Sequence, residues 1–204
     1  MIWLILLAAY LIGSIPTALL VGKYFFHVDI RDHGSKNPGA TNTLRVMGKR
    51  AAIIVLLIDV AKGMLAASLP LTFNVPVEPL YAGLIAVVGH CFPIFAGFRG
   101  GKAIATTAGA LLIVNIGMFL AVYVTFFAVI FLTKYVFMGS ISVGIAMLIY
   151  SFFSPDINEP LLFTAFIILL IFLHRSNLQN FFIGIEPKIN DKKVKGDRIP
   201  PKNF

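Results

Sequence analysis

A run of small, polar and basic residues extends from Gly34 to Arg45 and reads G-S-K-N-P-G-A-T-N-T-L-R. Glycines let the backbone approach a bound group closely. Ser, Asn and Thr offer neutral hydrogen bonds, and arginine offers a two-pronged cation, so the mixture suits a phosphate or another anion. The alternative interpretation is a solvated loop built from turn residues.

Two further polar clusters carry similar chemistry. The first is Gly97-Phe98-Arg99-Gly100-Gly101-Lys102, where free N–H groups and the positive end of a following helix would point at an anion. Because Ala103 follows the lysine, the Walker A pattern is not satisfied and a nucleotide is not indicated. The alternative is an ordinary tight turn with basic residues. The second cluster, His174-Arg175-Ser176-Asn177, is either part of a site or a simple basic helix end.

Ionisable residues also lie inside apolar segments. Asp59 and Lys62 are three residues apart, on one face of a helix, and are either functional or an ion pair that braces the structure. His90 is either a packed residue or a general base. Ser142 and Gly144 are typical of close helix packing in membranes.

The composition places these clusters in a membrane protein. Of 204 residues, 58% are hydrophobic and 13% charged, against about 25% charged in soluble domains. The apolar residues fall in blocks, which predicts an all-α integral membrane bundle with one domain over 1–187 and a basic, flexible tail over 188–204. The single cysteine, Cys91, excludes an internal disulfide and a multi-cysteine metal site. The N-terminus lacks a basic n-region, so we expect the first span to be retained.

A helix needs about 20 apolar residues to cross a bilayer. The candidate spans are 2–22, 51–73, 79–98, 138–153 and 160–173. The apolar block 103–133 would be about 46 Å long as one helix, so it is either one strongly tilted helix or two short helices broken near Asn115–Gly117.

Charge placement favours the second option, which gives seven transmembrane helices. With seven, all 17 Lys and Arg residues except Lys62 lie on one side of the membrane. The positive-inside rule makes that side cytoplasmic, with the N-terminus outside and the C-terminus inside. With six helices, the basic tail would lie outside.

Together the motifs identify a resemblance that covers the chain to about residue 182. The chain resembles the bacterial membrane glycerol-3-phosphate acyltransferases that use acyl phosphate as donor. The matching motifs are Gly13-Ser14-Ile15, Asn37-Pro38-Gly39-Ala40-Thr41-Asn42, Leu44-Arg45, Asp59, Lys62-Gly63, Gly89-His90, Phe92-Pro93, Gly97-Phe98, Gly100-Gly101-Lys102, Ala105-Thr106, His174 and Asn177. The family usually has Gly where this chain has Lys36 and Ala103, and Lys where it has Arg99.

The resemblance implies seven membrane helices and an active site at the cytoplasmic face. It implies acyl transfer from acyl phosphate to the sn-1 hydroxyl of glycerol 3-phosphate, giving 1-acyl-glycerol 3-phosphate (lysophosphatidic acid) and phosphate, the first acylation of bacterial phospholipid synthesis. Neither acyl carrier protein nor coenzyme A is required. We expect no cofactor, no metal ion and no nucleic-acid partner, and a monomer in the bacterial inner membrane. The competing function is a transporter or channel for a phosphorylated metabolite.

The residues expected to act in catalysis are Ser35, Arg45, His90, Lys102, His174 and Asn177. The residues expected to bind substrate are Asn37, Gly39, Thr41, Asn42, Lys62, Gly97, Gly100, Gly101, Thr106 and Ser142. The base is either a histidine or a phosphate oxygen of one substrate, and we favour the phosphate because both substrates bring one to the hydroxyl.

Overall fold

The computed structural model describes residues 1–154, 158–191 and 198–201, and these contain ten α-helices. The α-helices are α1 (Ile2–Gly13), α2 (Thr17–Val21), α3 (Ala40–Val46), α4 (Lys49–Thr72), α5 (Pro79–Cys91), α6 (Ile104–Val114), α7 (Ile116–Thr133), α8 (Val136–Ser151), α9 (Glu159–Leu173) and α10 (Arg175–Phe182). A π-helical turn (Gly22–Phe26) follows α2, and short 3-10 turns cover Ile30–Asp32 and Ile94–Ala96. The predicted all-α class is confirmed.

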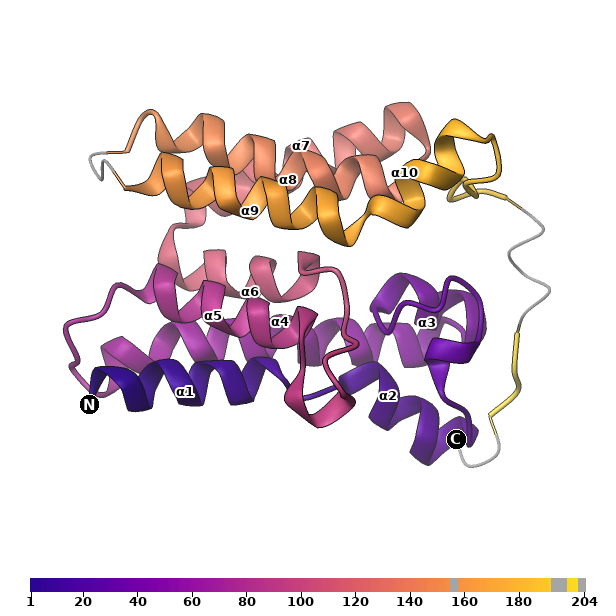
Figure 1. Cartoon of the computed structure of the whole chain (residues 1–204), viewed down its shortest axis with the longest axis horizontal. Helices are drawn as coiled ribbons and strands as arrows, with labels where there is room; N and C mark the ends of the chain where they lie inside the picture. The colour runs from indigo at the N-terminus through magenta and orange to yellow at the C-terminus, as the bar shows by residue number, and fades with distance from the viewer. Residues whose placement is uncertain (155–157, 192–197, 202–204) are drawn as a thin grey trace. The chain divides into compact units, whose positions relative to one another are not determined.

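The chain folds into two compact units. Among the described residues, the first comprises 1–114 and 198–201, and the second comprises 115–154 and 158–191. In the first unit, α1, α4, α5 and α6 run side by side (Figure 1). In the second unit, α8 packs against both α7 and α9, and α10 continues from α9 after a bend of 57°.

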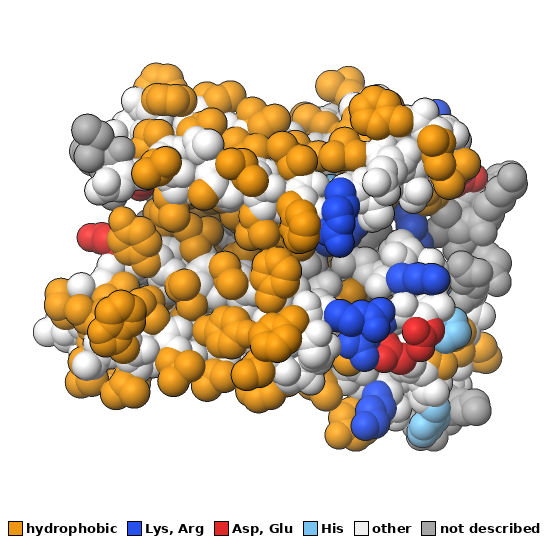
Figure 2. Space-filling model, viewed as in Figure 1, with side chains coloured by type: hydrophobic (Ala, Val, Ile, Leu, Met, Phe, Trp, Pro, Cys, Tyr) orange, Lys and Arg blue, Asp and Glu red, His pale blue; other side chains and the backbone are white. Residues whose placement is uncertain are grey.

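Several helices are long and apolar enough to cross a membrane. Among the described residues these are Ile2–Phe26, Lys49–Thr72, Pro79–Ala96 and Ile116–Thr133, with the bent pair α9 and α10 as a fifth if it is one span. The helices α6 and α8 are apolar but shorter. In Figure 2 hydrophobic side chains cover the first unit over α1, whereas charged side chains gather at its other end, over α2 and α3.

Local signals explain where the helices are interrupted. Pro16 lacks an N–H group, and the first span is interrupted between Gly13 and Thr17. The predicted break near Asn115 is confirmed, because α6 ends at Val114 and Asn115 caps α7 by accepting a hydrogen bond from the Met118 N–H at 3.0 Å. The interpretation of residues 34–45 as a loop is wrong for their second half, which forms most of α3.

The helices of the first unit cross at paired glycines. A Cβ atom at Gly63 on α4 would overlap the Thr106 carbonyl oxygen on α6, and one at Gly109 on α6 would overlap the Val60 carbonyl oxygen on α4. Small residues of this kind let two membrane helices approach backbone to backbone.

We therefore expect Gly63→Ala and Gly109→Ala each to lower the free energy of unfolding by about 1–3 kcal/mol, the usual cost of overpacking. Gly144→Ala is the matched control, because the two nearest atoms to a Cβ there belong to the Ile167 and Leu170 side chains rather than to the backbone. Thermal unfolding in detergent micelles measures the three variants. Equal midpoints for Gly63→Ala and the wild type would show that the crossing can open without cost.

The predicted basic tail lies partly outside the described residues, and its described residues 198–201 belong to the first unit. The Ile199 N–H donates to the Val46 carbonyl oxygen at 2.8 Å, and its side chain packs on a buried cluster that contains Val46 and Met47. The Arg198 guanidinium lies against Gly48, which joins α3 to α4 with a φ of +87°. The tail therefore contacts the end of the helix that carries Arg45.

Candidate active site

The buried amide of Asn42 organises the polar segment between the first span and α3. Asn42 is 1% exposed, and its Oδ1 atom accepts a hydrogen bond from the Ser35 N–H at 2.8 Å. Its Nδ2 atom donates to the carbonyl oxygens of His33, at 3.0 Å, and Ile30, at 3.4 Å. Gly34 has a φ of +58°, and a Cβ atom there would overlap Asn42 Oδ1. A single side chain thus fixes the backbone on both sides of Gly34.

This scaffold exposes other predicted residues of the segment. Ser35 and Thr41 are exposed, and Arg45 is half-buried on α3. Gly39 directly precedes α3 as its N-cap residue, and its carbonyl oxygen accepts hydrogen bonds from both the N–H and the side-chain hydroxyl of Thr43. Asn37 lies next to Gly39, with its Nδ2 atom 3.0 Å from the position of a Cβ atom there. Of the predicted residues here, Asn42 alone is buried, and its contacts are those of a positioning group.

An arginine connects this segment to the glycine-rich turn. The Arg31 guanidinium makes a two-pronged pair with Asp29, with Nε 3.0 Å from Oδ1 and Nη2 2.6 Å from Oδ2. Its Nη1 atom donates to the Ala96 carbonyl oxygen at 2.8 Å, directly before Gly97. The hydrogen bond from Arg31 lowers the pKa of Asp29 below its ordinary value, so Asp29 is ionised at neutral pH.

The turn from Gly97 to Lys102 is fastened to the end of α5. The N–H groups of Gly100 and Gly101 donate to the carbonyl oxygens of Cys91, at 3.1 Å, and His90, at 3.0 Å. The Phe98 N–H donates to the Pro93 carbonyl oxygen. The interpretation of the two glycine amides as free anion donors is therefore wrong. Substrate contact through Lys102, which is half-buried, or through other atoms of the turn stays a prediction.

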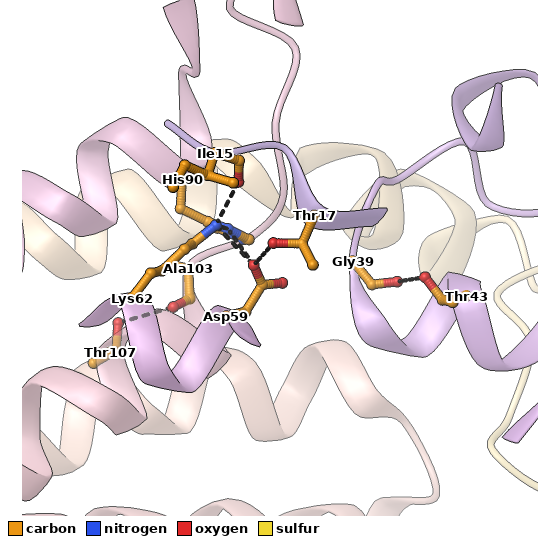
Figure 3. A network of polar contacts seen from close by, with 9 residues as sticks. All are labelled: Ile15, Thr17, Gly39, Thr43, Asp59, Lys62, His90, Ala103 and Thr107. Atoms are coloured by element: carbon orange, nitrogen blue, oxygen red, sulfur yellow. Dashed lines mark hydrogen bonds and ion pairs between the residues drawn. The ribbon is translucent and has the colours of Figure 1, made fainter. Parts of the chain in front are cut away.

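Behind the turn, four elements meet in a buried polar network (Figure 3). Lys62 Nζ lies 2.7 Å from Asp59 Oδ1, 2.8 Å from His90 Nδ1 and 3.1 Å from the Ile15 carbonyl oxygen. The Thr17 hydroxyl donates to Asp59 Oδ1 at 3.0 Å. Asp59 and Lys62 therefore form an ion pair, as one of the two alternatives expected. All three ammonium protons of Lys62 face protein acceptors.

A small hollow adjoins the network. Its volume is about 10 Å³, close to the space of one water molecule. The hollow is lined by Ile15, Pro16, Thr17, Pro38, Asp59, Lys62, His90, Pro93, Arg99, Gly100 and Gly101. Lys62 lines this hollow, and its direct contact with substrate stays a prediction.

The remaining predicted residues of the second unit lie on α8 and at the bend between α9 and α10. His174 is 3% exposed, and its Nδ1 atom lies 2.9 Å from the Leu170 carbonyl oxygen. Since Nδ1 must donate in that contact, Nε2 carries the lone pair of the neutral ring. The Asn177 Nδ2 atom donates to Glu186 Oε1 at 2.7 Å. The buried Ser142 hydroxyl donates to the Gly139 carbonyl oxygen, as expected for helix packing.

Comparison with known proteins decides the family. Residues 3–184 match the model of a family described as glycerol-3-phosphate acyltransferase. The chain belongs to the glycerol-3-phosphate acyltransferase family. Relatives of that name include one from Macrococcus caseolyticus, 46% identical over 93% of this chain and 98% of its own, and one from Bacillus subtilis, 45% identical over the same shares. The protein is therefore an acyltransferase.

A solved structure agrees with this assignment. A crystal structure of PlsY (YgiH), an integral membrane glycerol 3-phosphate acyltransferase, in its glycerol 3-phosphate form is similar with a TM-score of 0.85 and 30% identity. The similarity covers 94% of this chain and 97% of that chain. The lysophosphatidic acid form of PlsY gives a TM-score of 0.81 at 28% identity. The chain is thus an integral membrane member of the glycerol-3-phosphate acyltransferase family.

Two departures from the acyltransferase family's usual sequence fall at left-handed backbone positions. Lys36 has a φ of +59° and Ala103 a φ of +73°, where glycine carries no steric penalty. Lys36 is exposed and Ala103 is fully buried.

We expect Lys36→Gly to raise the free energy of unfolding by roughly 0.5–1 kcal/mol, because relief of left-handed strain exceeds the entropy that glycine adds to the unfolded chain. For Ala103→Gly we expect a change below about 0.5 kcal/mol, because the lost burial of a methyl group offsets the same relief. Parallel denaturation in detergent measures both variants. A destabilised Lys36→Gly protein would contradict the strain argument.

Four residues outside the predicted set contact predicted residues or the elements that carry them. Thr17, Arg31 and Asp59 do so in the first unit, and Glu186 does so in the second. Asp59 is itself one of the matching motifs and Arg31 is a charged residue close to one, whereas nothing local marks Thr17 or Glu186. Conversely, the predicted substrate-binding Thr106 is fully buried, and its hydroxyl has no hydrogen-bond partner within the described part of the chain. The described residues also contain no cluster of His, Cys, Asp and Glu that could hold a metal ion.

Proposed function

We propose that the protein transfers a fatty acyl group from acyl phosphate to the sn-1 hydroxyl of glycerol 3-phosphate, giving 1-acyl-glycerol 3-phosphate and phosphate. The observation that carries this proposal is the family match over residues 3–184, which includes the polar motifs. The similar PlsY structures, described as glycerol 3-phosphate and lysophosphatidic acid forms, support this acceptor and this product. In bacteria this is the first acylation of phospholipid synthesis.

The reaction requires the enzyme to position its two substrates, and it requires no protein nucleophile. Acyl phosphate is a mixed anhydride and is already activated, so the enzyme must hold two anionic groups in attack geometry, which can supply about 7–11 kcal/mol. Arg45, Lys102 and residues of the segment 34–42 would hold glycerol 3-phosphate. The residues of the segment are the exposed Ser35 and Thr41 and the half-buried Asn37 and Gly39. The rigid scaffold around Asn42 supports this role, since it fixes the backbone that presents Ser35.

The donor would bind through its phosphate and its acyl chain. Asn177 and the turn from Gly97 to Lys102 would hold the phosphate, and the acyl chain would lie between helices near Ser142. The hydroxyl of glycerol 3-phosphate can attack the acyl carbon, and phosphate can leave it, without a metal ion or a cofactor. A phosphate oxygen of a substrate would accept the proton of the attacking hydroxyl. The protein alternative to that phosphate is a histidine, His90 or His174.

We further propose seven transmembrane helices, with the N-terminus outside and the C-terminus and active site at the cytoplasmic face of the bacterial inner membrane. The four long helices, the bent pair and the two shorter apolar helices among the described residues support this number. Residues 1–187 would form one membrane domain that acts as a monomer without acyl carrier protein or coenzyme A. A reporter fused after Phe204 that proved external would contradict the orientation.

The decisive experiment uses purified protein with palmitoyl phosphate and glycerol 3-phosphate. We expect phosphate release and 1-acyl-glycerol 3-phosphate formation that require both substrates. The competing transporter function predicts movement of glycerol 3-phosphate across liposomes without acylation. Donor hydrolysis that ignores glycerol 3-phosphate would contradict the proposed acceptor.

A pair of arginine variants tests the anion site. Arg45→Ala should reduce kcat/KM for glycerol 3-phosphate by about 100-fold or more, the scale of losing a charge-assisted contact to a phosphate. Arg50→Ala removes the same charge from an exposed position at the start of α4, and it controls for the general electrostatic field. Equal effects of the two variants would assign the loss to that field rather than to a specific contact.

A further inference from the structure

We propose that Thr17, Asp59 and Lys62 form a buried relay that holds His90 in one tautomer and thereby positions the turn that carries Lys102. In this proposal His90 is a positioning residue and not the catalytic base. The inference rests on the acyl transfer proposed above, and it assigns a task to charged groups that no step of that reaction uses.

All four side chains of the relay are buried. Asp59 is 1% exposed, Lys62 4%, Thr17 4% and His90 7%. Removing one partner of a buried ion pair commonly destabilises a protein strongly, whereas an apolar pair of similar volume is often tolerated. A buried ion pair therefore does not by itself show that the pair is there to stabilise the fold. The contacts that the pair makes with other groups indicate a second role.

Only one assignment of hydrogen-bond donors and acceptors satisfies every contact of Lys62. An ammonium group has three protons and no lone pair. Lys62 Nζ directs its protons to Asp59 Oδ1, to the Ile15 carbonyl oxygen and to His90 Nδ1. The Ile15 carbonyl lies at the interruption of the first span, and the Thr17 hydroxyl adds a second hydrogen bond to Asp59 Oδ1. These three polar groups that face Lys62 are thus all acceptors.

This balance determines the protonation of His90. Because Nδ1 accepts from Lys62, the neutral ring carries its proton on Nε2. A doubly protonated ring would lose that hydrogen bond and place a second positive charge beside the ammonium group. The nitrogen with the lone pair faces Lys62, so it is not available to remove a proton from glycerol 3-phosphate. His174 has the opposite arrangement, with Nδ1 directed to the Leu170 carbonyl oxygen.

The other edge of the ring supports the turn. A Cβ atom at Gly101 would overlap His90 Nε2, so the ring lies directly against the Gly101 backbone. The His90 carbonyl oxygen accepts from the Gly101 N–H at 3.0 Å, and the Cys91 carbonyl oxygen accepts from the Gly100 N–H at 3.1 Å. A rotation of the ring would therefore displace the residue before Lys102. Displacements near 1 Å can cost about 100-fold in rate.

Two substitutions of His90 separate positioning from base catalysis. In His90→Asn the side-chain oxygen can lie where Nδ1 accepts from Lys62, whereas His90→Gln places its polar group nearer the position of Nε2. The relay predicts that Asn stays within about tenfold of wild-type kcat/KM, while Gln falls about 100-fold, mostly in kcat with palmitoyl phosphate and glycerol 3-phosphate. If both variants bind both substrates normally and show no turnover, His90 is a base and the relay is wrong.

A double variant separates positioning from bracing. Asp59→Leu/Lys62→Met replaces the ion pair by apolar side chains of similar size, so the helices can pack without buried charge. The relay predicts a folded protein whose kcat/KM stays about 100-fold below wild type. Full recovery of both folding and activity would overturn the proposal. Ser68→Ala is the control, because Ser68 also lies on α4 and its hydroxyl donates to the Met64 carbonyl oxygen one turn back.

A spectroscopic measurement tests the tautomer without relying on activity. In protein labelled with ¹⁵N-histidine, and with His90→Asn used for assignment, we expect a protonated Nε2 and an unprotonated Nδ1 for His90 at neutral pH. A protonated Nδ1 would overturn the relay. If the wild type forms no 1-acyl-glycerol 3-phosphate, the proposed function fails, while the tautomer still decides the hydrogen-bond assignment.

Discussion

Asn42→Asp is expected to reduce acyl transfer by about 100-fold or more while the membrane helices stay folded. The substitution changes one atom, but the new oxygen would face the carbonyl oxygens of His33 and Ile30, to which the native amide donates. A buried charged oxygen without a donor costs more than the roughly 1–3 kcal/mol of a neutral unsatisfied group. The segment that presents Ser35 would therefore detach from α3.

Steady-state kinetics and a thermal melt in detergent distinguish this local effect from global unfolding. Asn74→Asp is the matched control, because it makes the same change at an exposed residue just after α4. A protonated carboxyl regains a donor, so the ratio of variant to wild-type activity should rise as the pH falls. Wild-type kinetics for Asn42→Asp would exclude the organising role that we assign to this amide.

Gly100→Ala is the second substitution with a large expected effect. A Cβ atom there would overlap the His90 carbonyl oxygen and lie 2.5 Å from Pro93 Cδ and 2.7 Å from the Cys91 carbonyl oxygen. Two of these three neighbours are backbone atoms at the end of α5, which cannot move aside as a flexible side chain can. The turn must therefore shift and carry Lys102 with it, and we expect kcat/KM for palmitoyl phosphate to fall about 100-fold.

Gly97→Ala provides the comparison within the same turn. Gly97 has a φ of +62°, but a Cβ atom there meets nothing within 4 Å. Its cost is limited to left-handed strain of about 1–2 kcal/mol, and we expect less than a tenfold loss of activity. Donor-saturation curves for both variants measure the difference. If Gly97→Ala is the more damaged enzyme, close contact with α5 is not what the turn requires.

Features with a local cause could be predicted from the sequence. The break at Asn115 follows from a block too long for one span, and the Asp59–Lys62 pair follows from spacing along one helix. Helix α3 could not be predicted, because its seven residues show no apolar periodicity. Its last residue, Val46, is fully buried in a cluster that also contains residues of the first span and α4.

Contacts between segments far apart in the chain could not be predicted from the sequence. Thr17 is 42 residues from Asp59, and Lys62 is 28 residues from His90, so no spacing rule connects them. The amides of Gly100 and Gly101 looked available because only the fold brings the end of α5 within hydrogen-bond distance. The sequence identifies the polar side chains that are candidates for the site. Whether each one faces substrate or another protein group depends on tertiary packing.

The contact between Ile199 and Val46 also constrains how the protein is made in the cell. Roughly 150 residues separate the two positions, which at ordinary bacterial translation rates corresponds to about 8–30 s of synthesis. Until the last residues leave the ribosome, the end of α3 lacks its hydrogen-bonding and packing partner. Nascent chains without the C-terminus should therefore insert their helices into the membrane before the segment that carries Arg45 reaches its final packing.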